Sequence, residues 1–117
     1  MDAELDTGDI LVQRAVEITP SSTGTSLVMA TLDLVPEVLT EALDQLEFGT
    51  AQPVPQDLSL RSFFHKRSER DSLVDWNWPA ADIERLIRAQ SDPYPNAYTY
   101  FGGGRLRLIS AHVSRCT

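Results

Sequence analysis

Hydrophobic positions along this chain of 117 residues fall into segments separated by turn-forming residues. Residues 9–18 contain the aliphatic run 10–12, which predicts a strand buried on both faces of an α/β sheet. From residue 25 to residue 46, apolar side chains recur every three or four positions and predict one wide face of an amphipathic helix. Pro36 is expected to bend or break this helix, and Gly49 is expected to end it.

Residues 50–60 change in character. Pro53 and Pro55 alternate there without a helical pattern, which predicts an extended linker and a domain boundary. Beyond it, residues 73–76 are expected to form a short strand. Pro79 then opens a predicted helix that continues through Ser91. The apolar stripe of this helix consists of Ile83, Leu86, Ile87 and Gln90.

The last segment predicts a β-hairpin. Strands are expected at residues 97–101 and 106–113, joined across three consecutive glycines, 102–104. Followed by Arg105, these glycines have a superficial likeness to a phosphate-binding loop. They lack the lysine and the strand–loop–helix context of such loops, so the tip of a hairpin is favoured.

Composition and charge narrow the possible environment. The apolar fraction of 42% indicates a folded core, and no apolar run approaches the roughly 20 residues of a membrane helix. The acidic start, residues 1–4, does not resemble a secretory signal, and the single cysteine, Cys116, is typical of a reducing cytoplasm. We therefore expect a cytoplasmic location and no membrane partner. Because there are no Cys/His clusters or carboxylate pairs at ligand spacing, no metal is expected.

The net charge of −7 conceals an asymmetry between the two halves of the chain. Residues 1–60 carry 11 acidic residues and one basic residue, which gives 1 − 11 = −10. Residues 61–117 carry nine basic and six acidic residues, which gives 9 − 6 = +3. If a polyanion binds, we expect it at the second half, although the small excess does not by itself establish RNA binding.

Four short motifs and their order along the chain are informative about the family: Asp6-Thr7-Gly8-Asp9-Ile10, Asp75-Trp76, Ile87-Arg88-Ala89 and Pro93-Tyr94-Pro95-Asn96-Ala97-Tyr98. Together with the predicted elements between them, they resemble the back half of the methionyl-tRNA formyltransferase family. The resemblance implies an α+β chain. Residues 1–49 would be the closing strand and helix of the α/β catalytic domain, residues 50–60 a linker, and residues 61–117 an incomplete OB-like C-terminal barrel. The chain is thus expected to be a piece of a longer protein.

The turn at Asp6 has two interpretations. By itself it is an Asx-type turn in which Gly8 supplies an unusual backbone angle. Through the resemblance, Asp6 is the catalytic candidate that matches the aspartate of an Asn/His/Asp constellation, and the backbone of Thr7 and Gly8 approaches the folate. The family's formyl donor is 10-formyltetrahydrofolate. Its chemistry needs hydrogen-bond donors at an oxyanion and a carboxylate that orients a histidine.

The two histidines do not complete this constellation. His65 lies between aromatic and basic residues and is expected at the surface, while His112 is expected to be half-exposed on a strand. Neither occurs in an Asn-x-His arrangement, and neither is assigned to catalysis. This chain alone is therefore expected to be inactive.

The resemblance also implies RNA contacts at Lys66 and Arg67, because the linker and the barrel of tRNA-formylating members hold the acceptor. The alternative is a solvated charged surface interleaved with Glu69 and Asp71. Nearby aromatic residues could stack bases, although core packing is the favoured interpretation for Trp76, Trp78, Tyr94, Tyr98, Tyr100 and Phe101.

Three functions remain open from the sequence. The leading hypothesis is formylation of the amino group of initiator methionyl-tRNA. The second is formylation of a small amine acceptor, either an amino sugar or a hydroxylated ornithine. The third is a non-catalytic binding remnant, which is suggested by the lack of a suitably placed histidine and asparagine.

Overall fold

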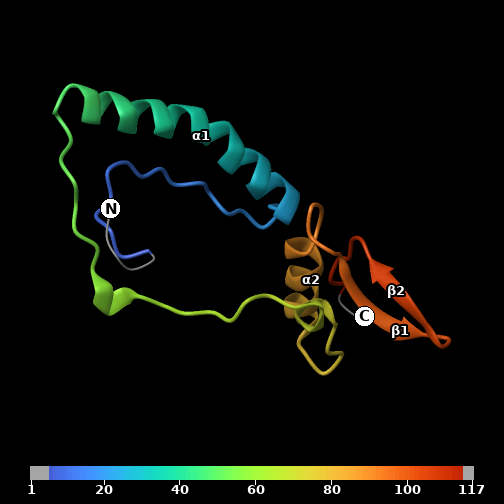
Figure 1. Ribbon diagram of the computed structural model, residues 1–117. Coiled ribbons are helices and arrows are strands. Elements are labelled where there is room, and N and C mark those ends of the chain that lie inside the picture. Colours follow the sequence, from blue (N-terminus) through green and yellow to red (C-terminus); the bar gives the residue numbers. More distant parts are fainter. Residues whose placement is uncertain (1–5, 115–117) are drawn as a thin grey trace. The chain divides into compact units, whose positions relative to one another are not determined.

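The computed structural model describes residues 6–114 (Figure 1). These residues divide into two compact units. The first unit contains residues 6–17 and 30–65, and the second contains residues 18–29 and 66–114. The elements, in chain order, are α1 (Gly24–Glu47), the 3₁₀ turns η1 (Leu58–Leu60) and η2 (Glu69–Ser72), α2 (Ala80–Ala89), β1 (Ala97–Phe101) and β2 (Gly104–Leu108).

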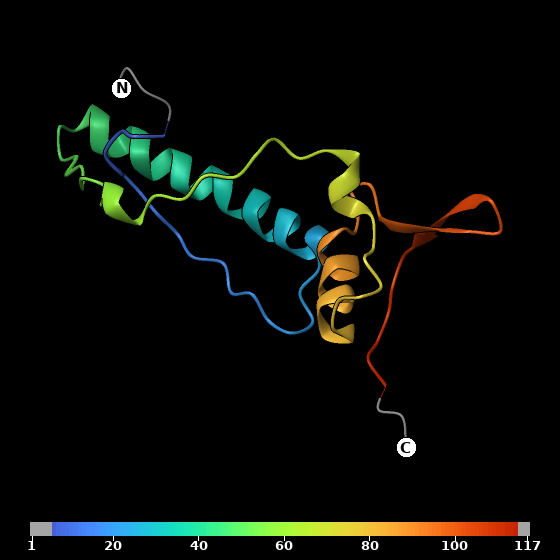
Figure 2. The same cartoon turned by 90° about the horizontal axis from the view of Figure 1, so that it is seen from below.

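Helix α1 matches the predicted amphipathic helix and is not broken at Pro36 (Figures 1 and 2). A proline removes one backbone donor from the ladder, and the neighbouring turns keep their helical geometry. Gly49 ends the helix as predicted, with a φ of 64°. The N–H of Thr50 donates to the carbonyl of Gln45 at 2.9 Å, and that of Gly49 to Leu46 at 3.3 Å. This pair of bonds is the Schellman arrangement, which satisfies the last carbonyls of a helix.

The predicted strand at residues 9–18 is wrong. The segment runs alongside α1 (Figures 1 and 2), but its only β-type pairing within the described residues is one antiparallel bridge between Ile10 and Val54. The two residues exchange N–H···O bonds of 2.9 Å. A strand needs a neighbouring strand along its whole length, and the described residues supply one position of pairing. Arg14 instead anchors the segment by pairing with Glu37 and Glu41 of α1.

The apolar face of α1 is incompletely covered within the described residues. Val12, Val16 and Leu34 contribute to a groove of about 640 Å³ between the N-terminal segment and the helix. Leu39 and Leu43 remain more than half exposed. None of the helices in the described part of the chain is both long enough and apolar enough to cross a membrane.

Helix α2 confirms the prediction of a helix opened by proline. The carbonyl of Pro79 accepts from the N–H of Asp82 at 2.8 Å and from that of Ile83 at 3.2 Å. The helix ends at Ala89, with Gln90 as its cap, which is two residues before the predicted end at Ser91.

The hydrophobic core of the second unit lies between α2 and the hairpin. Val74, Ile87 and Ala97 are buried, with Ile87 only 3% exposed and Ala97 fully buried. The partly buried residues packed against them are Ile83, Leu86 and Leu108. The predicted stripe of α2 is therefore the face that points into this core.

Strands β1 and β2 form the predicted hairpin, in a sheet of two antiparallel strands. Ala97 pairs with Leu108 and Phe101 with Gly104. Gly102 and Gly103 have φ angles of 58° and 80°, values that a two-residue hairpin turn requires and that glycine adopts without strain. The second strand ends at Leu108 and not at residue 113. The OB-like barrel remains a prediction.

The predicted strand at residues 73–76 is also wrong. Leu73 makes one parallel bridge to Tyr98, and the chain then turns. The Asp75 carboxylate accepts from the backbone N–H and the side-chain amide of Asn77, at 2.9 and 2.8 Å. This local Asx turn competes with strand geometry and ends the extended backbone.

The start of α1 belongs to the second unit because residues 18–29 are fastened to the end of α2. Arg88 Nη1 donates to the carbonyl of Ser22 at 2.6 Å, and the N–H of Thr25 donates to Ser91 Oγ at 2.9 Å. A Cβ at Gly24 would lie 2.6 Å from the carbonyl oxygen of Ala89, closer than real Cβ contacts allow. Gly24 thus permits this close approach. The domain boundary at residues 50–60 stays a prediction.

Candidate functional site

The turn at Asp6 is exposed at its first residue and half-buried at Thr7 and Gly8. Its unusual backbone angle lies at Asp6, with a φ of 59°, and not at Gly8 as predicted. Aspartate and asparagine tolerate the left-handed region better than most residues with a side chain. The turn therefore fixes the backbone of the candidate carboxylate while its side chain faces solvent.

Gln56 holds this turn, which sequence reasoning did not foresee. Its Nε2 donates to the carbonyl of Gly8 at 2.6 Å and to that of Asp6 at 3.4 Å. The antiparallel Ile10–Val54 bridge lies two residues after Gly8 and two residues before Gln56. The predicted linker is thus a pairing partner of the turn and not a free spacer. A glutamine between Pro55 and Asp57 carries no sequence signal of this role.

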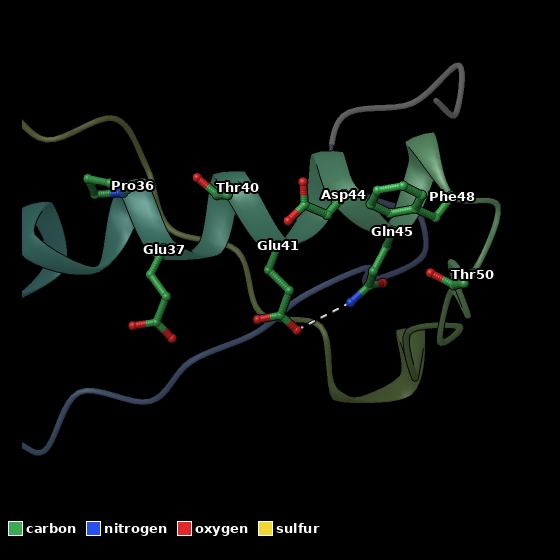
Figure 3. A pocket seen from close by; sticks show the side chains of 8 residues that line it. All are labelled: Pro36, Glu37, Thr40, Glu41, Asp44, Gln45, Phe48 and Thr50. Atoms are coloured by element: carbon green, nitrogen blue, oxygen red, sulfur yellow. Dashed lines mark hydrogen bonds between the residues drawn. The ribbon is translucent and has the colours of Figure 1, made fainter.

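An acidic hollow on α1 is the second feature of the first unit. It has a volume of about 560 Å³, and Glu37, Glu41 and Gln45 extend from one side of the helix (Figure 3). Gln45 Nε2 donates to Glu41 at 3.2 Å. Arg14 Nε binds Glu37 at 3.1 Å, and this hydrogen bond, followed by the charge of Glu41, raises the pKa of the guanidinium. Arg14 forms ion pairs with two of the carboxylates in this hollow, Glu37 and Glu41, so these side chains already have a partner within the first unit.

Lys66 and Arg67 begin the part of the second unit that follows the linker, and both are exposed. Arg67 Nη2 donates to Ser72 Oγ at 3.1 Å, and its Cζ lies 5.4 Å from the centroid of the Tyr94 ring. The candidate catalytic turn belongs to the first unit. The two groups of candidate residues therefore belong to different units.

Most of the aromatic residues are not core residues within the described part of the chain, contrary to the favoured prediction. Trp76 is 61% exposed, and Trp78, Tyr94, Tyr100 and Phe101 are exposed as well. Tyr98 is buried as predicted, and burial raises the pKa of its hydroxyl. Trp76 is oriented by its indole N–H, which donates to Thr99 Oγ1 at 2.9 Å.

The two histidines are surface residues. His65 is exposed, as predicted. His112 is exposed and lies beyond the end of β2, so its expected place on a strand is wrong. Cys116 lies outside the described residues. Within residues 6–114, no group of three or more His, Cys, Asp or Glu side chains could hold a metal ion.

Comparisons with known proteins all find similarity to formyltransferases. Residues 66–116 match the model of the formyl transferase C-terminal domain. A methionyl-tRNA formyltransferase of Roseiflexus sp. (strain RS-1) is 37% identical over 99% of this chain and 36% of its own length. One of Acidovorax ebreus (strain TPSY) is 35% identical over 100% of this chain and 36% of its own length. The chain therefore spans about a third of these curated relatives.

Solved structures show the same fold. The methionyl-tRNA formyltransferase from Clostridium thermocellum has a TM-score of 0.74 and 22% identity, covering 97% of this chain and 48% of that chain. A 4-N formyltransferase from Francisella tularensis has a TM-score of 0.74 and 19% identity, covering 99% of this chain and 49% of that chain. Nearly the whole chain is thus similar to methionyl-tRNA formyltransferases, and residues 66–116 belong to the formyl transferase C-terminal domain family.

Proposed function

We propose that this chain is part of a 10-formyltetrahydrofolate-dependent N-formyltransferase whose acceptor is the amino group of initiator methionyl-tRNA. The observation that supports this most strongly is the similarity to methionyl-tRNA formyltransferases along nearly the whole chain. That similarity includes the Asp6 turn as well as the domain that contains Lys66 and Arg67.

Asp6 is the proposed positioning residue at the formyl centre. When bound, 10-formyltetrahydrofolate supplies the formyl group that the acceptor amine takes up. The Asp6 carboxylate accepts a hydrogen bond from an imidazole elsewhere in the complete protein. It thereby orients that ring and stabilises its positive charge when the ring takes the amine proton. The geometry in favour is a solvent-facing carboxylate on a turn that Gln56 fixes.

The second unit has the proposed role of holding the acceptor RNA. Its basic side chains include Lys66 and Arg67, and the sequence from residue 61 onward has a net charge of +3. Such charges neutralise backbone phosphates and release counterions, which makes binding sensitive to salt. The excess is small, so we expect orientation of individual cations to matter more than total charge.

An acceptor competition tests this function in the complete protein encoded by the natural gene. The enzyme receives 10-formyltetrahydrofolate and an equimolar mixture of methionyl-tRNA, hydroxyornithine and an amino sugar, and mass spectrometry identifies the formylated product. We expect formylmethionyl-tRNA as the main product, with uncharged tRNA as the control that accepts no formyl group. A product that is only a formylated small amine would overturn the RNA acceptor. Folded protein without any transfer would support the non-catalytic interpretation.

A further inference from the structure

A buried polar pair lies beside the candidate RNA-binding residues. Ser72 is 1% exposed and Gln90 is 6% exposed, and they are the buried polar residues among those described. Ser72 Oγ donates to Gln90 Oε1 at 3.3 Å. The backbone of Gln90 is fixed as well, because its N–H donates to Leu86 at 3.0 Å and its carbonyl accepts from Asn96 Nδ2 at 3.3 Å. The pair therefore has a defined orientation.

This pair offers a hydrogen-bond acceptor to the guanidinium of Arg67. A serine hydroxyl has one proton to donate and can also accept. Since the Ser72 proton points to Gln90, its lone pairs are available to Arg67 Nη2, which donates at 3.1 Å. On its other side the guanidinium lies over Tyr94. Two hydrogen bonds thus connect the exposed guanidinium of Arg67, through Ser72 Oγ, to the buried side-chain carbonyl of Gln90.

Arg67 differs from the other anchored arginines of the second unit in the charge of its partners. Ion pairs with carboxylates occupy the other three: Arg85 with Asp82, Arg88 with Glu84, and Arg105 with Glu69. Within residues 6–114, the partners of Arg67 are a hydroxyl and an aromatic ring, both neutral. Neither of these partners carries a negative charge that would offset the charge of Arg67. A guanidinium has five N–H donors, of which the Ser72 bond uses one.

We propose that Arg67 is an oriented phosphate-binding residue for the acceptor RNA, and that Ser72 and Gln90 are its positioning residues. A guanidinium binds phosphate through two parallel N–H···O bonds, and its planar fork must face the anion. Fixing the fork in advance reduces the ordering cost of binding. This inference rests on the proposed RNA acceptor and names the group that contacts its backbone.

The test measures the affinity of the complete protein for methionyl-tRNA as a function of salt concentration. Arg67→Ala is expected to weaken binding about tenfold and to reduce the slope of log K against log [salt] by about one. Ser72→Ala keeps the charge of Arg67 but removes the hydrogen bond that orients its guanidinium. It should weaken binding about threefold while leaving the salt slope unchanged, because the same number of counterions is released.

Arginine-to-lysine changes at two positions provide the matched control. Arg67→Lys keeps the charge and loses the fork, so we expect it to weaken binding severalfold. Arg107→Lys, at an exposed position of β2, should bind as the wild type does. Ser72→Thr keeps the hydroxyl and should restore the binding that Ser72→Ala loses, while circular dichroism confirms that each variant is folded.

The possible outcomes separate this inference from the proposed function. If the wild type shows no salt-dependent binding of methionyl-tRNA, the RNA acceptor and the phosphate contact both fail. If the wild type binds but Arg67→Lys binds equally well, the oriented contact is wrong while the RNA acceptor stands. Wild-type affinity in Ser72→Ala would show that the buried pair has only a structural role.

Discussion

Asp6→Asn is expected to lower kcat for formyl transfer by about 10⁴-fold in the complete protein, since a carboxylate that orients a catalytic histidine contributes on that order. This substitution removes the negative charge while keeping the size of the side chain and the backbone conformation. Asparagine has nearly the same shape and also tolerates the φ of 59° found at Asp6. Its backbone carbonyl can still accept from Gln56. The loss would therefore report the missing negative charge and not a disrupted turn.

The matched control is Asp9→Asn, which removes an exposed carboxylate from the same segment. We expect this variant to retain a rate within a fewfold of the wild type. The pH profile gives a second readout. Because a nearby carboxylate raises the pKa of an imidazole, Asp6→Asn should move the acidic limb of the rate profile to lower pH. Equal rates for Asp6→Asn and the wild type would reduce Asp6 to a turn residue.

Ile87→Ala is expected to lower the unfolding free energy of the second unit by about 2–5 kcal/mol, the range found when a buried isoleucine is truncated. Ile87 is 3% exposed and lies in the core cluster with Val74 and Ala97. Removing its outer carbons leaves a cavity between α2 and the hairpin. Hydrogen exchange of peptides that cover residues 80–101, followed by mass spectrometry, measures the change where it occurs.

Ile109→Ala is the control for this prediction, because it deletes the same atoms at a position that is 65% exposed. We expect its effect to stay within about 0.5 kcal/mol. If both substitutions accelerate exchange equally, the cluster around Ile87 does not stabilise the unit.

The sequence predicted elements whose signals are local. The stripe of α2, the proline that opens it and the glycines of the hairpin each fix a geometry through nearby residues, and the structure confirms them. Gly49 acts in the same way at the end of α1. In each case, the side chain or the backbone freedom of one residue decides the conformation.

The two predicted strands failed for the opposite reason. A strand depends on partners that are distant in sequence, and residues 9–18 find one such position at Val54. At residues 73–76, the Asx turn of Asp75 ends the extended chain. Aliphatic composition alone cannot reveal whether a partner strand exists, or whether a local side-chain bond competes with it.

For the candidate sites, the sequence predicted which residues carry the charges but not which residues hold them in place. Asp6 and the basic pair came from the resemblance, whereas their supports came from the structure. Gln56 and Ser72 lie in no motif, and Gln90 was predicted only as part of the apolar stripe of α2. The hydrogen bond of this buried pair joins residues 18 positions apart, and it depends on the tertiary structure that brings the last residue of η2 next to the cap of α2.

The most direct test of the central claim is the fraction of initiator methionyl-tRNA that carries a formyl group in source cells lacking this gene. Acid gel electrophoresis separates the formylated from the unformylated charged tRNA. The account predicts that the formylated fraction falls close to zero and returns when the wild-type gene, but not its Asp6→Asn version, is restored. An unchanged formylated fraction in the deletion strain would contradict the assignment of this protein to initiator tRNA formylation.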